Sequence, residues 1–143
     1  MLAQFTINSV IDNLDDFGSP IDEPEITRTT ADGEVSENDG ALTIFYKEKS
    51  EDTVTSTRIE LRPDGSVMLR RMGGIVSDML FLEGKETKTI YQIPPYKFDM
   101  TVTTKRIRSS FTDKGGEIQL IYSMNVGGGL KNVRMKISYT ARG

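Results

Sequence analysis

The sequence predicts an all-β fold, a single antiparallel up-and-down β-barrel of roughly ten strands. Glycines beside turn-forming residues recur at short intervals, and this spacing is typical of hairpins. The segments between them run for about 8 to 12 residues, are rich in Thr, Ile, Val, Tyr and Phe, and alternate apolar with polar positions. Because no helical crossovers separate the strands, a parallel sheet is excluded, and the sequential hairpins favour a barrel over a sandwich. The expected turns are at Asp32-Gly33, Asp39-Gly40, Asp64-Gly65, Glu83-Gly84, Gly115-Gly116 and Gly127-Gly128-Gly129.

The N-terminal third contains two predicted strands on either side of an acidic segment. Apolar residues between positions 5 and 11 indicate the first strand, and the acids that follow in residues 12–25 indicate a loop. Residues 41–48 alternate in the same way, so one face of this segment is expected to be buried. That face consists of Leu42, Ile44 and Tyr46.

The middle of the chain is expected to form a hairpin and a further strand. Residues 58–72 place apolar alternation on both sides of the turn sequence Pro63-Asp64-Gly65. Residues 75–82 are ambiguous, because their apolar spacing also fits a short helix. The segment is short and is bounded by Gly74 and Gly84, which favours a strand.

The C-terminal part shows the clearest alternation. Pro94-Pro95 marks the start of a strand, since proline cannot donate a hydrogen bond to a β-ladder. The strand that follows has one apolar face, made of Tyr96, Phe98, Met100 and Val102. Residues 117–126 and 132–139 then alternate without interruption on both sides of the triple glycine at 127–129, which predicts a hairpin.

Composition excludes several kinds of chemistry. The 143 residues include no Cys and no His, so disulfides, thiolate nucleophiles and imidazole bases or metal ligands are excluded. The length predicts a single domain over residues 1–143. The N-terminus has no signal-peptide pattern, and no segment is apolar for the ~18 residues that a membrane helix needs. We therefore expect a cytoplasmic protein that does not bind membranes.

The net charge of −3 conceals an uneven distribution. Residues 12–52 hold thirteen acidic and three basic side chains, a net charge of −10, which leaves +7 for the rest of the chain. This division predicts opposed acidic and basic faces that favour association, unless the charges are scattered over solvated strands.

Five short stretches match those of a known family, in order and with similar spacing. They are Tyr46-Lys47-Glu48, Val67–Gly73, Phe81–Gly84, Thr104–Ile107 and Tyr122–Gly127. On these stretches the chain, from about residue 26 to residue 139, resembles the YwiB-like bacterial family of unknown function. The resemblance implies a calycin-type, lipocalin-like β-barrel and carries no activity with it. One difference is local: the family tends to have a glycine shortly after the proline that corresponds to Pro95, where this chain has Tyr96-Lys97-Phe98.

A charged site inside the barrel is predicted because Arg71 lies on the apolar face of its strand. A guanidinium group among apolar neighbours is costly unless it is paired or hydrated, so Arg71 is expected to have a carboxylate partner. Glu48 continues the apolar face that includes Tyr46, which predicts an inward ion pair between Glu48 and Arg71. With hydroxyls from Tyr46 and Tyr122, these residues form a candidate ligand-binding site for a small apolar or amphipathic molecule. The alternative is a charge pair that only closes one end of the barrel.

A basic surface is the second candidate site. Lys105, Arg106 and Arg108 follow one another closely and would attract an anionic partner such as RNA. No aromatic residues interleave with this run and the chain as a whole is acidic, so nucleic acid is disfavoured and solvated strand faces are the simpler explanation. The alternative function is thus a charged interaction module for protein or nucleic acid with a filled barrel, and a homodimer is left open. Further bases that would extend the surface are Arg70, Arg71, Lys131, Arg134 and Lys136.

No pattern indicates catalysis or a cofactor. The triple glycine at 127–129 lacks the helix and the Lys-Ser/Thr of a phosphate-binding loop. The acids of residues 12–25 lack the spacing of a calcium loop, so no metal is expected. No nucleophile is spaced with a base in a way that selects it. We therefore expect a protein without enzymatic activity that binds a small molecule in its barrel.

Overall fold

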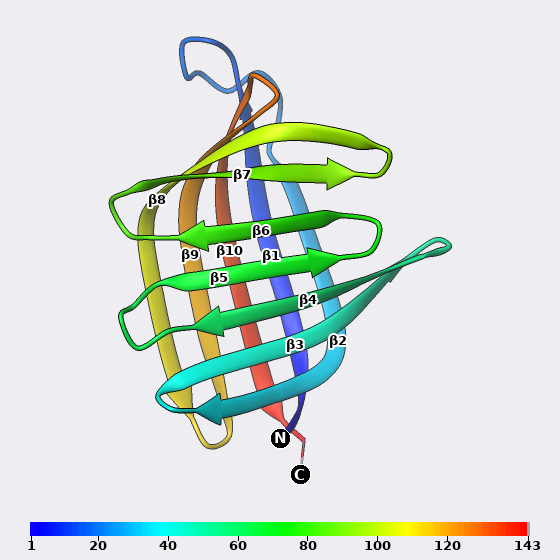
Figure 1. Ribbon diagram of the computed structural model, residues 1–143, viewed down its shortest axis with the longest axis vertical. Coiled ribbons are helices and arrows are strands. Elements are labelled where there is room, and N and C mark those ends of the chain that lie inside the picture. The colour runs from blue at the N-terminus through cyan, green and yellow to red at the C-terminus, as the bar shows by residue number, and fades with distance from the viewer. Residues whose placement is uncertain (143) are drawn as a thin grey trace.

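The computed structural model describes residues 1–142, and all regular structure in this part of the chain is β-strand (Figure 1). This result confirms the all-β prediction and the expected number of strands. No helix among the described residues is long and apolar enough to cross a membrane. The ten strands are β1 (Leu2–Leu14), β2 (Glu25–Asn38), β3 (Ala41–Ser50), β4 (Thr53–Leu61), β5 (Val67–Met72), β6 (Val76–Phe81), β7 (Glu86–Ile93), β8 (Tyr96–Thr112), β9 (Gly115–Val126) and β10 (Gly129–Ala141).

The strands close into a barrel in sequence order, as predicted. Each strand pairs antiparallel with the next, and β1 pairs with β10 along its length, which completes the ring. Figure 1 shows β1, β9 and β10 upright in one layer while β3 to β7 cross in front of them. The long strands β2 and β8 curve from one layer into the other, so the barrel is a flattened one with two crossing layers.

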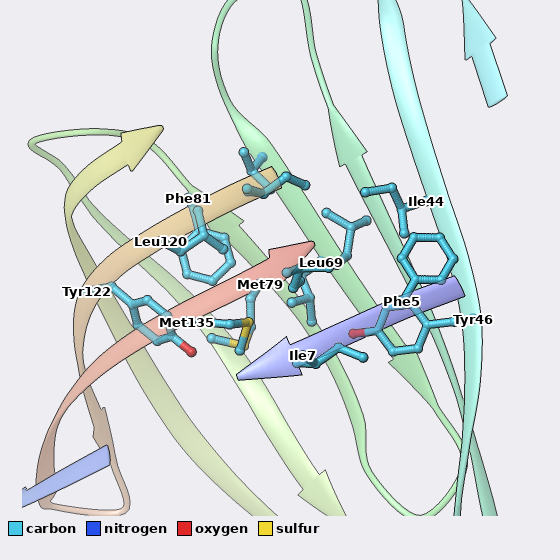
Figure 2. Close-up of a cluster of buried hydrophobic side chains, with 14 of the residues drawn as sticks. Phe5, Ile7, Ile44, Tyr46, Leu69, Met79, Phe81, Leu120, Tyr122 and Met135 are labelled. Carbon is cyan, nitrogen blue, oxygen red and sulfur yellow. The ribbon is translucent and has the colours of Figure 1, made fainter. Parts of the chain in front are cut away.

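Large apolar side chains fill the middle of this barrel. Phe5, Tyr46 and Phe81 are almost completely buried there, among aliphatic side chains from both layers (Figure 2). The Phe5 ring lies 5.5 Å from the ring of Tyr46 and 5.6 Å from that of Tyr139. Each fully buried side chain of this size contributes about 1.5–3 kcal/mol through the hydrophobic effect. The filled middle leaves the two ends of the barrel for any ligand.

The prediction of a turn at Asp32-Gly33 is wrong, because both residues lie inside β2. A Cβ atom on Gly33 would overlap the backbone oxygen of Phe45 and lie 2.9 Å from the Phe5 ring. Glycine at this position therefore permits a close approach of neighbouring groups in a strand interior. The predicted Gly115-Gly116 turn is displaced for a related reason: both residues begin β9, and a Cβ atom on Gly116 would overlap the Phe111 ring.

The other glycine turns connect successive strands as predicted, and residues 76–81 form β6 and not a helix. One irregularity affects the direction of functional side chains: the register of β8 against β9 shifts between Thr104 and Arg106. Thr104 is buried and Ile107 packs against the core. The two residues between them, Lys105 and Arg106, are therefore both exposed.

Candidate functional site

Arg71 lies in a row of polar side chains that crosses the front layer. The strand registers put Thr57 opposite Arg71 on one side and Ser77 opposite it on the other, and extend the row to Tyr46 in β3 and Tyr91 in β7. Directly opposite residues point to the same side of a sheet. Tyr46, Thr57 and Ser77 are buried, whereas Arg71 and Tyr91 are half-buried. The row therefore lines the inner side of the barrel and reaches solvent at Arg71.

The Tyr122 side chain enters the same interior from the opposite layer. Its ring packs edge-on against that of Phe81, with 4.8 Å between the ring centroids. Burial raises the pKa of Tyr122 to about 12, although the positive charge of Arg71 opposes this shift. Burial and the negative charge of Glu48 also raise the pKa of Tyr46, and Arg71 again opposes the shift. Arg71 thus lies within electrostatic range of both tyrosines, and both are neutral hydrogen-bond donors at neutral pH.

Three buried hydroxyl groups of the barrel interior make no hydrogen bond of standard geometry among the described residues, although that of Thr57 lies near the Tyr46 hydroxyl and lowers its pKa slightly against the effect of burial. They belong to Thr57, Ser77 and Thr104, which are at most 3% exposed. Thr57 and Ser77 flank Arg71, and Thr104 lies opposite Tyr122. An unsatisfied buried hydroxyl costs about 1–3 kcal/mol, and such groups are uncommon in folded proteins. Thr57 and Ser77, which stand on both sides of Arg71, therefore provide polar atoms that a bound polar group would satisfy.

Thr57, Ser77 and Thr104 are not among the residues predicted from the sequence. Alternation alone places Ser77 on the face shared by Met79 and Phe81, and a polar residue on such a face is the informative exception. Ser77 could therefore have been identified from the sequence as a polar residue of the interior. The position of Ser77 opposite Arg71 depends on the register between strands, which one sequence does not specify.

The predicted ion pair between Glu48 and Arg71 is not formed. The four ion pairs between described residues involve other side chains. Glu48 lies opposite Thr55 and Arg71 lies opposite Thr57, so the two are offset along the strands and separated by β4. Because neighbouring strands lie about 4.8 Å apart, the backbones of β3 and β5 are about 10 Å apart. Glu48 also belongs to no metal site, since no group of three or more His, Cys, Asp or Glu among the described residues is arranged to hold an ion.

Two hollows lie at the other ends of β3 and β4, where no site was predicted. One has a volume of about 600 Å³ and is lined by Val35, Phe111 and Tyr139 among others. Its neighbour, of about 360 Å³, is lined by several residues that include Leu42 and Leu61. None of the four predicted ligand-binding residues lines either hollow. The unpartnered hydroxyls described above also lie elsewhere, so the Arg71 end remains the candidate site.

The predicted basic residues Lys105, Arg106 and Arg108 are exposed on the outer side of β8. The registers continue from Arg108 through β9 to Lys136, and from Arg106 through β9 to Arg134. The predicted bases of β8 and those at positions 134 and 136 of β10 therefore lie on one outer surface, on either side of β9.

The remaining predicted bases do not join that surface. Arg70 lies on the outer side of the front layer, 3.8 Å from Asp78, and Arg71 faces the interior. Lys131 lies on the inward-facing side of β10, in alternation with the exposed residues Asn132 and Arg134, and is half-buried. Arg28, which stands in the acidic part of the sequence, does reach the surface, because β2 pairs with β1 and places it opposite Asn8.

Comparisons with known proteins agree with this architecture. A family described as Domain of unknown function (DUF1934) matches residues 18–137. Among solved structures, the crystal structure of the ywiB protein from Bacillus subtilis is similar, with a TM-score of 0.83, 22% sequence identity, and coverage of 99% of this chain and 92% of that chain. At this identity the likeness shows the fold alone. No curated protein matches the chain. The resemblance predicted from the five short stretches is confirmed.

Proposed function

This chain belongs to the family described as Domain of unknown function (DUF1934), and from the chemistry of its interior we propose that the barrel binds a small amphipathic molecule whose oxyanion contacts Arg71. One observation carries the proposal. Arg71 has no ion-pair partner among the described residues, and it lies between the buried hydroxyls of Thr57 and Ser77, of which that of Ser77 makes no hydrogen bond there and that of Thr57 approaches only the Tyr46 hydroxyl, without standard geometry.

A carboxylate or phosphate suits these side chains. A guanidinium presents several N–H donors in one plane and binds such groups through two parallel hydrogen bonds. Directly opposite residues on neighbouring strands have Cβ atoms about 4.5–5.5 Å apart, so the hydroxyls of Thr57 and Ser77 stand close on both sides of Arg71. Each hydroxyl can donate to an oxyanion held by Arg71, and binding would satisfy groups that otherwise lack partners.

The filled middle of the barrel limits the size and placement of the ligand. Leu69 and Met79, the next inward residues after Arg71 and Ser77, are fully or almost fully buried. The oxyanion therefore binds at the row, while the apolar part of the ligand contacts the half-buried ring of Tyr91 near the rim. A short amphipathic molecule fits this arrangement better than a long lipid that would need the whole lumen.

We also propose that the barrel binds this ligand without converting it. General-base catalysis needs a group whose pKa lies near the operating pH. The raised pKa values of Tyr46 and Tyr122 make both hydroxyls donors and not bases at neutral pH. Glu48 lies two strands away from Arg71 and does not flank the proposed oxyanion position.

Native mass spectrometry of the protein purified from its own host tests this proposal. Wild-type protein is expected to carry an added small mass that disappears on denaturation. The variant Arg71→Met is expected to lose this mass, and Arg70→Met is expected to keep it, because Arg70 is exposed on the other side of the same strand. A wild-type mass equal to that of the chain alone, or the same added mass on Arg71→Met, would contradict the proposal.

A further inference from the structure

The loop between β1 and β2 presents an aromatic ring to solvent on an ordered turn. Phe17 is 94% exposed. The Oδ1 atom of Asp15 accepts hydrogen bonds from the backbone N–H groups of Phe17 and Ser19, both at 2.9 Å. The backbone of Asp15 also bonds to Ser19 and Gly18, at 2.8 and 3.0 Å. Because the turn is already fixed, Phe17 loses little conformational freedom on binding, which is a property of residues that anchor interfaces.

The same loop is acidic. Residues 15–24 hold four acidic side chains and no basic one, and Asp12 and Glu25 add two more in the adjoining ends of β1 and β2. Ile21, which is 59% exposed, adds a second exposed apolar side chain to the loop. Figure 1 shows the loop projecting beyond one end of the barrel, clear of the layers. A partner that fits this loop would combine positive charge with an apolar depression.

A surface of that chemistry lies on the outer side of β8, β9, β10, β1 and β2, and we name it the basic face. Strand pairing arranges it in two neighbouring rows that contain no acidic residue. Among the described residues, only one of its five bases takes part in an ion pair, which joins Lys136 to Glu117 at 3.3 Å. The rows are Arg108, Gln119, Lys136, Asn8 and Arg28, and Arg106, Ile121, Arg134, Val10 and Ile26.

The basic face also has an apolar depression. A hollow of about 210 Å³ is lined by Val10 and Ile121, which stand on either side of Arg134, and by Lys136 and other neighbours. Ile26, at the end of the same row, is 74% exposed. An aromatic ring placed here would cover apolar surface and meet a guanidinium, which is attracted to the face of such a ring.

We propose that Phe17 and the acidic loop of one copy of this chain dock on the basic face of a second copy. The second copy is favoured because the loop and the face are complementary both in charge and in the pairing of an exposed ring with a hollow. A stable interface buries about 1,200–2,000 Å², more than one loop supplies. A twofold dimer in which each copy inserts its loop into the other doubles the contact and closes the assembly.

A nucleic acid explains the basic face less well. Single-stranded nucleic acids are bound through aromatic side chains that stack on bases, and neither row contains one. Apolar residues, in contrast, stand beside the bases of the second row, Ile121 between Arg106 and Arg134 and Val10 next to Arg134, where a phosphate backbone has no use for them.

Sedimentation velocity over a range of protein concentrations tests the proposal. Wild-type protein is expected to dimerise, and Phe17→Ser is expected to weaken the dimer about tenfold or more, as loss of an anchor residue does. Ile90→Ser is the matched control, since Ile90 is 50% exposed on β7 in the other layer and should leave the dimer intact. Arg134→Glu is expected to weaken the dimer, and Asp16→Arg in the same chain is expected to restore part of it.

Three results would overturn the proposal. The first is a wild-type protein that stays monomeric throughout, and the second is a Phe17→Ser variant that dimerises like wild type. The third is a monomer that binds single-stranded RNA, with binding lost in Arg134→Glu and unchanged in Phe17→Ser, which would assign the basic face to nucleic acid.

Discussion

Arg71 lies directly opposite Ser77 across β5 and β6, yet the buried Ser77 hydroxyl makes no hydrogen bond within the described chain. Thr57, on the other side of Arg71, makes no hydrogen bond of standard geometry and approaches only the Tyr46 hydroxyl. Apolar residues at these inward positions would stabilise the barrel more, because they would remove the cost of unsatisfied polar groups. Residues that lower stability without a compensating contact in the protein are expected where a ligand binds.

The first prediction concerns the unpartnered hydroxyls. Ser77→Ala removes a buried hydroxyl without a hydrogen bond, so the free energy of unfolding is expected to rise by about 1 kcal/mol. Thr87→Val is the control: its hydroxyl donates to the carbonyl of Leu80 at 2.6 Å, and its loss is expected to lower the free energy of unfolding by about 1 kcal/mol. Urea unfolding measures both, and equal destabilisation by the two substitutions would contradict the account.

The second prediction separates a binding residue from a structural one. Arg71→Met removes a half-buried charge that has no carboxylate partner within the described chain, so the free energy of unfolding without ligand is expected to stay the same or rise by up to about 1 kcal/mol. A structural plug would behave differently, since removing one member of a satisfied buried pair is destabilising. A fall of more than about 2 kcal/mol in urea unfolding would favour the plug.

The third prediction is a pH dependence of stability. The pKa of Tyr122 is about 12 in the folded protein against 10.0 for an exposed tyrosine, because burial favours the neutral form. Below pH 10 the hydroxyl is protonated in both states and its contribution is complete. As the pH rises from 10 towards 12 the unfolded state loses the proton first, so stability falls by about 1.4 kcal/mol per pH unit.

Tyr122→Phe isolates this effect. The unfolding free energy of wild type minus that of the variant is expected to fall as the pH rises above 10, because phenylalanine does not titrate. Other titrating groups act equally on both proteins. A difference that does not change with pH would mean that Tyr122 is not buried as described.

The fourth prediction tests the role of Gly33 inside β2. Gly33→Ala is expected to lower the free energy of unfolding by about 1–3 kcal/mol, as overpacking does, because the added Cβ meets Phe45 and Phe5. Gly129→Ala is the control, since its Cβ would lie 3.4 Å from the nearest atom, an oxygen of Val126. Thermal unfolding should separate the two, and equal midpoints would show that β2 does not approach β3 so closely.

Much of the fold could be predicted because the side-chain period of a strand is a local property. Alternation located β9 and β10, and the short length and bounding glycines of residues 75–82 favoured the strand that became β6. Glycine was a less reliable indicator of turns, since Asp32-Gly33 and Asp39-Gly40 are the same dipeptide, yet only the second is a turn. What distinguishes them is the approach of Phe45 to Gly33 from a neighbouring strand, which no local pattern contains.

The sites depended more strongly on register. The alternation of inward and outward positions along its strand placed Arg71 inside the barrel. The offset between β3 and β5 that separates it from Glu48 follows from strand pairing. Arg28 shows that register can also add a residue to a surface to which the sequence did not assign it. It belongs to the acidic part of the sequence, and only the pairing of β2 with β1 brings it beside Asn8 on the basic face.

An NMR titration with octanoate, a carboxylate on a short alkyl chain, tests the central claim most directly. The account predicts saturable shifts of the Arg71 Nε–H signal and of the Thr57 and Ser77 amides, no such shifts with uncharged 1-octanol, and loss of the amide shifts in Arg71→Met but not in Arg70→Met. If octanoate leaves these signals unchanged, or shifts the amides equally in Arg71→Met, Arg71 does not hold an oxyanion.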